Sequence, residues 1–147
     1  MSETGIEQAA GMVRSDPFAS YLGIEFLLIE SGHAVARMPL RDEHRNFMGL
    51  VHGGAIFSLA DVTFGAAANA GGTMAMAINV SIDYFAPAGD SPYLEADVME
   101  DARAWRGGHY VMRVTTAAGE TVAACHGWAY HTSRPLTQSA CRKDDNL

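Results

Sequence analysis

A lone carboxylate marks the middle of this chain. Asp61 is the only Asp, Glu, Lys or Arg among the 37 residues that separate Arg45 from Asp83. It lies in an alanine-rich run that reads as a helix ending at Gly71-Gly72. Because burial disfavours the charged form of a carboxylate, Asp61 is expected to be hydrogen-bonded, neutralised or used in chemistry. It is therefore a candidate catalytic carboxylate, and the alternative is a residue that caps a loop or meets an arginine.

Paired glycines precede this helix. Gly53 and Gly54 follow His52 at the end of a loop that begins near Asn46. Backbone N–H groups at a helix start, together with the helix dipole, favour negative charge. A carbonyl oxygen that becomes an oxyanion would be stabilised there. The structural alternatives are a tight glycine turn, a histidine hydrogen-bonded to its own loop, and an asparagine that caps a turn.

The elements that flank this helix are predicted to be strands. The helix is apolar on nearly every side and too short to span a membrane, so it must be buried. A short helix is predicted at residues 3–14. Alternating apolar positions and β-branched residues predict six strands, at residues 23–29, 33–40, 74–85, 93–100, 109–116 and 121–132. These elements favour an α+β fold in which a curved antiparallel sheet wraps around one long central helix.

Length and composition limit the other possibilities. The 147 residues suit one domain, which we place at residues 21–134, after an N-terminal helical segment at 1–20 and before a flexible C-terminal tail at 135–147. A net charge of −7 without a Lys/Arg cluster argues against nucleic-acid binding. Two cysteines outside any CxxC pattern argue against a disulfide framework and a metal site. The first residues do not read as a signal peptide, so a cytoplasmic location is expected.

The motif formed by Asn46, His52-Gly53-Gly54 and Asp61 resembles that of hotdog-fold acyl-CoA thioesterases of the phenylacetate-degradation type. The likeness covers about Leu22 to His131. It includes residues 78–88, which are similar to that family's strand running into a Pro-Ala turn. A His-Gly-Gly triplet alone is a weak motif, but its position before a helix that carries Asp61 makes it fairly specific. The resemblance implies a hotdog fold.

This resemblance also implies an activity, the hydrolysis of acyl-CoA thioesters to free acid and coenzyme A. The N–H of Gly53 would polarise the thioester carbonyl, and Asp61 would act as general base or as nucleophile. Asn46 would orient the carboxylate or the attacking water, and His52 would hold the loop or contact the thioester. A homodimer is implied, with Asp61 of one subunit facing the Asn46–Gly53 loop of the other, and dimers are expected to pair into a homotetramer.

Substrate contacts are expected near the motif and where relatives meet coenzyme A. The expected residues are Gly54, Phe47, Met48, Phe57, Arg45, Arg106 and His109. Leu50, Ile56 and Phe64 are further candidates for lining an acyl pocket, although the same apolar residues would serve any core. No separate cofactor is expected, because coenzyme A is part of the substrate, and neither a membrane nor a nucleic acid is an expected partner. The chain departs from the family pattern at Ala77, where many relatives have Ser or Thr, and at Ala86, where a polar residue is frequent.

Two other functions fit parts of the pattern. A catalytically silent acyl-CoA sensor would use the same pocket, although a binder has no evident need for a buried carboxylate. A hotdog-fold enoyl-CoA hydratase would need Asp-x-Asn followed shortly by His, and residues 42–46 do not have that spacing. The sequence leaves open the acyl group, the choice between coenzyme A and a carrier protein, and the route taken by Asp61.

Overall fold

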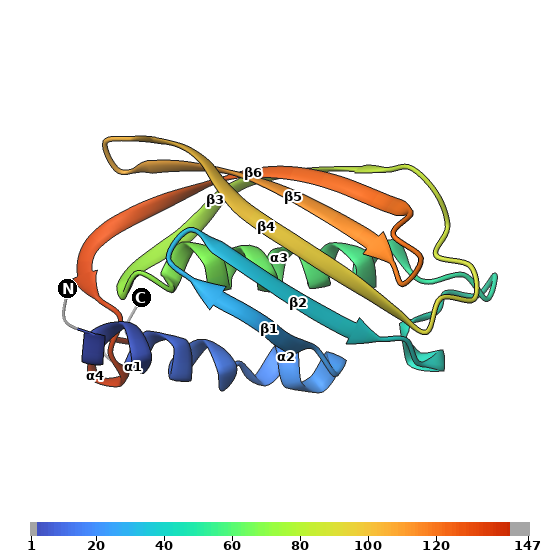
Figure 1. The fold of residues 1–147 in the computed structure, drawn as a ribbon, viewed down its shortest axis with the longest axis horizontal. Helices are drawn as coiled ribbons and strands as arrows, with labels where there is room; N and C mark the ends of the chain where they lie inside the picture. Colours follow the sequence, from blue (N-terminus) through green and yellow to red (C-terminus); the bar gives the residue numbers. More distant parts are fainter. Residues whose placement is uncertain (1–2, 142–147) are drawn as a thin grey trace.

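Six antiparallel strands form one sheet, and helix α3 lies against its concave face (Figure 1). The structure is a computed structural model that describes residues 3–141. The strand order is β1-β2-β4-β5-β6-β3. The strands span Glu25–Glu30 (β1), His33–Pro39 (β2), Thr73–Tyr84 (β3), Tyr93–Ala104 (β4), Gly107–Thr116 (β5) and Thr121–Pro135 (β6). The predicted α+β fold, with a curved sheet around a central helix, is confirmed.

Helix α3 spans Gly53–Asn69 and packs against the strands β2 to β5. Leu59, Ala60 and Phe64 are at most 1% exposed, as the apolar run predicted. The one hydroxyl in this buried face is satisfied within the helix, because Thr63 donates to the carbonyl of Leu59 at 2.7 Å. No helix within residues 3–141 is long and apolar enough to cross a membrane. Burial on several sides therefore holds the start and the middle of α3 in a fixed relation to the sheet.

The N-terminal segment contains one helix more than predicted. Helix α1 spans Glu3–Arg14, as expected, and α2 spans Pro17–Leu22. The carboxylate of Asp16 caps α2 by accepting from the N–H groups of Phe18 and Ala19 at 2.9 and 3.2 Å. An Asp-Pro pair is a helix-start signal, and it would have been readable in the sequence. Helix α1 contacts α3, and α2 continues from the end of α1 (Figure 1).

The C-terminal segment is more regular than a simple tail in its described part. Strand β6 continues through Pro135, and a short helix α4 follows at Gln138–Cys141. The prediction placed a flexible tail at residues 135–147, of which residues 142–147 lie outside the described residues. That this tail is flexible stays a prediction.

Two strands, β1 and β3, form the edges of the sheet. The β3 edge carries apolar side chains that face away from the core, since Met76 is 54% exposed and Ile78 is 67% exposed. Phe85, just beyond β3, is 65% exposed. A long apolar edge with unpaired backbone groups is a surface on which a second chain can pair. The homodimer that the family resemblance implies stays a prediction.

Candidate active site

His52 forms the cap of helix α3. Its backbone is extended, and its Nδ1 atom accepts a hydrogen bond from the N–H of Gly54 at 2.8 Å. In the neutral imidazole the proton must therefore be on Nε2, which is left as a donor toward solvent. One of the two roles predicted for His52, holding the loop at the helix start, matches this geometry. The same bond occupies the N–H of Gly54, so that group is not available to a substrate.

Gly53 is the first residue of α3, and its two backbone groups have different surroundings. Its carbonyl accepts a hydrogen bond from the hydroxyl of Tyr84 on β3 at 2.9 Å. Its N–H has no hydrogen-bond partner within residues 3–141. A Cβ atom at this position would lie 3.2 Å from the Tyr84 hydroxyl, so a side chain here would press on Tyr84. The positive end of α3 thus presents one unpaired donor, at Gly53.

The loop before α3 is held by its own polar side chains. The Oδ1 atom of Asn46 accepts from the N–H groups of Met48 and Leu50 at 2.9 and 3.2 Å. The guanidinium of Arg45 donates to the carbonyl of Gly49 at 3.0 Å, and Gly49 has a φ of 76°, which favours glycine. The turn role that the sequence offered as the alternative for Asn46 is therefore present. The amide nitrogen of Asn46 has no partner in the described chain and remains a free donor.

A cavity of about 530 Å³ lies at this helix start. It is lined by Asn46, Leu50, Val51, Gly53, Gly54 and Ile56 and by residues 84–87. Of the predicted pocket residues, Leu50 and Ile56 line it together with Gly54. Phe57 is half-buried outside its lining, and Phe47 is 97% exposed. Met48 is also exposed, so the loop's two largest apolar side chains point away from the cavity in a single chain.

Phe64 does not line a pocket. It is 1% exposed, and its ring packs against Tyr110 with centroids 5.1 Å apart. Of the two roles left open for Phe64, lining an acyl pocket and packing in the core, the structure shows packing in the core. Phe64 lies three residues after Asp61, on the face of α3 that packs against the sheet. Its position near the motif in the sequence did not show whether it lies on this buried face or on the face that lines the groove.

Asp61 lies well away from the helix start. It follows Gly53 by eight residues, which is about 12 Å along the helix axis. Its carboxylate is half-buried and makes no hydrogen bond or ion pair within residues 3–141. Burial raises the pKa of the Asp61 carboxyl above its usual range. The sequence interpretation that Asp61 is capping a loop or meeting an arginine finds no support in the described chain.

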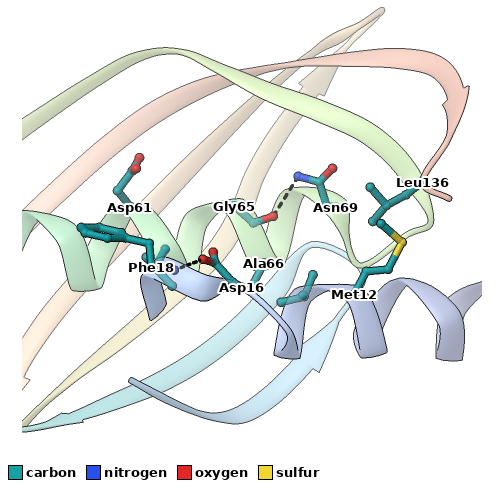
Figure 2. A pocket seen from close by; sticks show the side chains of 10 residues that line it. Met12, Asp16, Phe18, Asp61, Gly65, Ala66, Asn69 and Leu136 are labelled. Atoms are coloured by element: carbon teal, nitrogen blue, oxygen red, sulfur yellow. Dashed lines mark hydrogen bonds between the residues drawn. The ribbon is translucent and has the colours of Figure 1, made fainter. Parts of the chain in front are cut away.

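A second hollow contains Asp61. It is a groove of about 460 Å³ between α3 and the α1–α2 segment (Figure 2). Asp61 is among its lining residues, whereas Gly53 and Asn46 are not. One chain therefore brings Asn46, Gly53 and Gly54 together and leaves Asp61 apart from them.

The nearby thiol offers no alternative nucleophile. Burial, and then the carboxylates of Asp83 and Asp61, raise the pKa of Cys125 to about 11. Cys125 is 5% exposed and stays protonated at neutral pH. The unpaired Asp61 carboxylate therefore stays the candidate reactive group in this part of α3.

Arg106 and His109 lie at the other end of the fold. They belong to the β4–β5 hairpin, which lies near the end of α3. Glu100 of this hairpin donates its N–H to the carbonyl of Gly32, and the N–H of Gly32 donates to the carbonyl of Ala67 in α3. The guanidinium of Arg106 donates to the hydroxyl of Tyr130 at 2.9 Å. His109 contacts the Asp101 carboxylate at 3.1 Å. Neither residue joins the Asn46–Gly53 loop within one chain.

Sequence reasoning missed the aromatic residues at the end of β3. Tyr84 and Phe85 line the cavity, and Tyr84 also anchors Gly53. The available signal was an aromatic pair directly before the Ala86-Pro87 turn, inside the segment that resembled the family. Only the packing of β3 against the start of α3 shows which backbone group Tyr84 contacts.

Comparison with known proteins identifies the family. Residues 7–129 match a family described as a domain of unknown function, DUF4442. The chain is 31% identical to the acyl-coenzyme A thioesterase PaaI of Escherichia coli over 142 residues, which is 95% of this chain and 100% of that protein. The chain belongs to the PaaI family of acyl-CoA thioesterases. It is an acyl-CoA thioesterase, and the resemblance read from the Asn46–Asp61 motif is confirmed.

Solved structures of PaaI proteins have the same fold. The structure of E. coli PaaI superposes with a TM-score of 0.83 at 29% identity, covering 92% of this chain and 99% of that one. A mutant of the phenylacetic acid degradation protein PaaI from Thermus thermophilus gives a TM-score of 0.75 at 33% identity, with 80% and 100% covered. A hypothetical thioesterase from Streptococcus pneumoniae, solved with coenzyme A, shares the fold at 20% identity, with a TM-score of 0.77 and 86% and 99% covered. The hotdog fold of this PaaI relative is confirmed.

Proposed function

We propose that this thioesterase hydrolyses acyl-CoA in a site built by two subunits, from the Gly53 N–H of one and the Asp61 carboxylate of the other. One observation carries the proposal: both groups lack a partner in the described chain, yet they are about 12 Å apart along one rigid helix. Reacting groups must approach to about 3–3.5 Å. A single chain cannot place both on one thioester, whereas two copies can.

The Gly53 N–H supplies the electrophilic half of the site. A thioester carbonyl in the cavity would accept this N–H, and the dipole of α3 would stabilise the negative charge that develops on its oxygen. The Tyr84 hydroxyl bond to the Gly53 carbonyl supports this role because it holds the residue that carries this N–H at the helix start. One such donor contributes about 10²–10³-fold to turnover in acyl transfer.

Asp61 supplies the other half by one of two routes. As general base, it takes a proton from water, the hydroxide adds to the thioester carbon, and the carbon–sulfur bond breaks to release the coenzyme A thiolate. As nucleophile, a carboxylate oxygen displaces the thiolate to give a mixed anhydride, which water then hydrolyses to free acid and Asp61. The raised pKa suits both routes, because a more basic carboxylate accepts protons and attacks more readily.

Asn46 and His52 complete the helix-start half of the site. The free amide nitrogen of Asn46 is available to orient the carboxylate of the partner or the attacking water. His52 holds the loop through Gly54, and its Nε2 donor faces outward where the thioester would enter. Both roles position groups around the thioester without taking part in bond making.

The β3 edge is the surface on which we expect the second subunit to pair. Its exposed Met76 and Ile78 would be covered by β3 of another copy, and the exposed Phe47 beside the loop would gain a neighbour. Arg45 lies in the loop beside Asn46 and would be a cation for the phosphates of coenzyme A. Arg106 and His109 would reach substrate only in a site completed by another subunit. The homodimer, and its pairing into a homotetramer, are parts of this proposal.

Release of free thiol from purified protein tests the assignment of Asp61. With a panel of acyl-CoA substrates, Asp61→Asn and Asp61→Ala should each lose most of the turnover while the circular dichroism spectrum stays unchanged. Asp97→Asn is the matched control, since Asp97 is an exposed aspartate on β4 that contacts His33 at 2.9 Å and lines neither hollow. Full turnover in Asp61→Ala would eliminate the proposed role.

The sensor alternative makes the opposite prediction. A silent acyl-CoA binder would bind acyl-CoA tightly in calorimetry and release no thiol from any member of the panel. The unpartnered carboxylate favours the enzyme, because binding an uncharged acyl group does not require a half-buried aspartate.

A further inference from the structure

The groove that contains Asp61 has a defined direction. Asp61 and Phe18 lie at one end, and Met12 and Leu136 lie at the other, near the end of α3 (Figure 2). Along its floor, α3 contributes Asp61, then Gly65 one turn later, and then Asn69. From Asp61 to Asn69 the helix advances by eight residues, or about 12 Å. The groove is thus an elongated space that leads away from the carboxylate.

Two of the three polar side chains in this groove make hydrogen bonds to nearby backbone groups. The Oδ1 atom of Asp16 accepts the two N–H groups that begin α2. The amide of Asn69 donates to the carbonyls of Gly65 and Ala75 at 2.9 and 3.1 Å and accepts from the N–H of Ala75 at 2.9 Å. Asp61 alone has no partner in the described chain. Beyond Asp61 the groove therefore suits an apolar group that makes no hydrogen bonds of its own.

Gly65 keeps the floor of the groove open. A Cβ atom at this position would have no heavy atom within 4 Å, and the residue is not among the glycines with positive φ. Neither backbone conformation nor close packing demands glycine here, and glycine disfavours a helix interior relative to alanine. What the missing side chain does provide is free space one turn beyond the reactive carboxylate.

We infer that this groove receives the acyl chain of the substrate, and that Gly65 sets how far an unbranched apolar chain can extend beyond Asp61. This inference rests on the proposed function, because Asp61 must stand at the thioester end of the groove. The acyl group runs from the thioester carbon along α3, over Gly65 and under the α1–α2 segment. The substrates are then extended apolar acyl groups, while an acetyl group ends before Gly65.

Binding of coenzyme A thioethers tests the groove without relying on turnover, because an alkyl thioether has no carbonyl to hydrolyse. In calorimetry, Gly65→Leu should raise the Kd of S-decyl-CoA by about tenfold or more and change that of S-ethyl-CoA by less than about twofold. Gly65→Ala should move the S-decyl-CoA affinity in the same direction by a smaller factor. This milder variant keeps the test decisive should Gly65→Leu fail to fold.

Gly11→Leu is the matched control. Gly11 lies in α1, a Cβ there would also have no heavy atom within 4 Å, and the residue does not line the groove. It should bind both thioethers like the wild-type protein. The groove assignment is overturned if both Gly65 variants bind S-decyl-CoA as tightly as Gly11→Leu does, or if they lose affinity equally for both thioethers.

Turnover of decanoyl-CoA separates this inference from the proposed function. One possible result is that binding of S-decyl-CoA depends on Gly65 while the wild-type protein releases no thiol from decanoyl-CoA. This result would support the groove and contradict the hydrolytic role. Thiol release that is equal in wild-type protein and in the Gly65 variants would support hydrolysis and contradict the groove. Thiol release that falls in the Gly65 variants for decanoyl-CoA, and not for acetyl-CoA, supports both.

Discussion

The hydroxyl of Tyr84 donates a 2.9 Å hydrogen bond to the carbonyl of Gly53 and so ties the end of β3 to the first residue of α3. Gly53 also carries the unpaired N–H at the helix start, one Cα atom away from the carbonyl that Tyr84 holds. The orientation of this donor therefore depends on a side chain 31 residues further along the chain.

Removing this hydroxyl should weaken catalysis more than folding. Tyr84→Phe should lower kcat/KM for acyl-CoA by about two- to tenfold, equivalent to about 0.5–1.5 kcal/mol for one hydrogen bond. Steady-state thiol release measures the effect. Tyr93→Phe is the control, because the Tyr93 hydroxyl has no hydrogen bond within residues 3–141 while its ring stays under Arg37. Equal kinetics in the two variants would remove Tyr84 from the site.

The Gly53 N–H can be deleted by proline, which places the same Cβ beside Tyr84 as alanine does. Proline is favoured at the first position of a helix, and His52, with φ −63° and ψ 134°, already has the backbone that a residue before proline requires. Gly53→Pro should therefore fold and lose about 10²–10³-fold in turnover. Gly53→Ala introduces a Cβ beside Tyr84 while it keeps the N–H, so it separates steric from electrostatic loss. If the proline variant retains the activity of the alanine variant, the N–H plays no part in catalysis.

Mixing two inactive variants tests whether the site is shared. A dimer of one Asp61→Asn chain and one Gly53→Pro chain contains one site with both groups intact and one with neither. Co-refolding equal amounts should restore about a quarter of the wild-type activity, because half of the random dimers are mixed and each has one working site. Thiol release before and after co-refolding gives the answer. Failure to recover any activity would place both groups in one chain.

Asp61 is expected to reduce stability at neutral pH. Burial raises its pKa in the folded state, so the folded protein holds this proton more tightly than the unfolded chain, in which the pKa is about 3.9. The protonated Asp61 carboxyl therefore adds to the free energy of unfolding at low pH, and this addition is lost as the pH rises through the pKa of the folded state. Asp61→Asn should raise Tm at pH 7, and this gain should shrink as the pH approaches 4.

Thermal melts across this pH range measure the effect. Asp97→Asn should show no comparable gain, because Asp97 is exposed and contacts His33. A lower Tm for Asp61→Asn at pH 7 would mean that Asp61 makes a stabilising contact in solution.

The sequence predicts the fold well because its signals are local. The alanine-rich run and its glycine stop identify α3, and alternating residues identify the six strands to within a few residues at most ends. The prediction for β4 ended at residue 100 and the strand continues to Ala104, because its last residues pair with β5 across an irregular register after Glu100. The hydrogen bonds of Asp16 explain α2, which the sequence reading overlooked.

The site was less predictable, because its geometry depends on packing. The motif indicated Asp61, Gly53, Asn46 and His52, but spacing alone did not reveal which N–H remains unpaired. Phe64 and Phe47 are equally apolar in the sequence, yet one lies in the core and the other is almost fully exposed. The groove over Gly65 exists only because α1 and α2 pack beside α3, and no local pattern encodes that contact.

On the proposed arrangement, the distance between Gly53 and Asp61 along α3 has a consequence for the chain before assembly. A newly made monomer carries every group that the reaction needs and cannot bring them to one substrate. Its activity would then depend on protein concentration, falling on dilution below the dissociation constant of the dimer. Chains that have folded but have not yet formed a dimer would then not hydrolyse acyl-CoA.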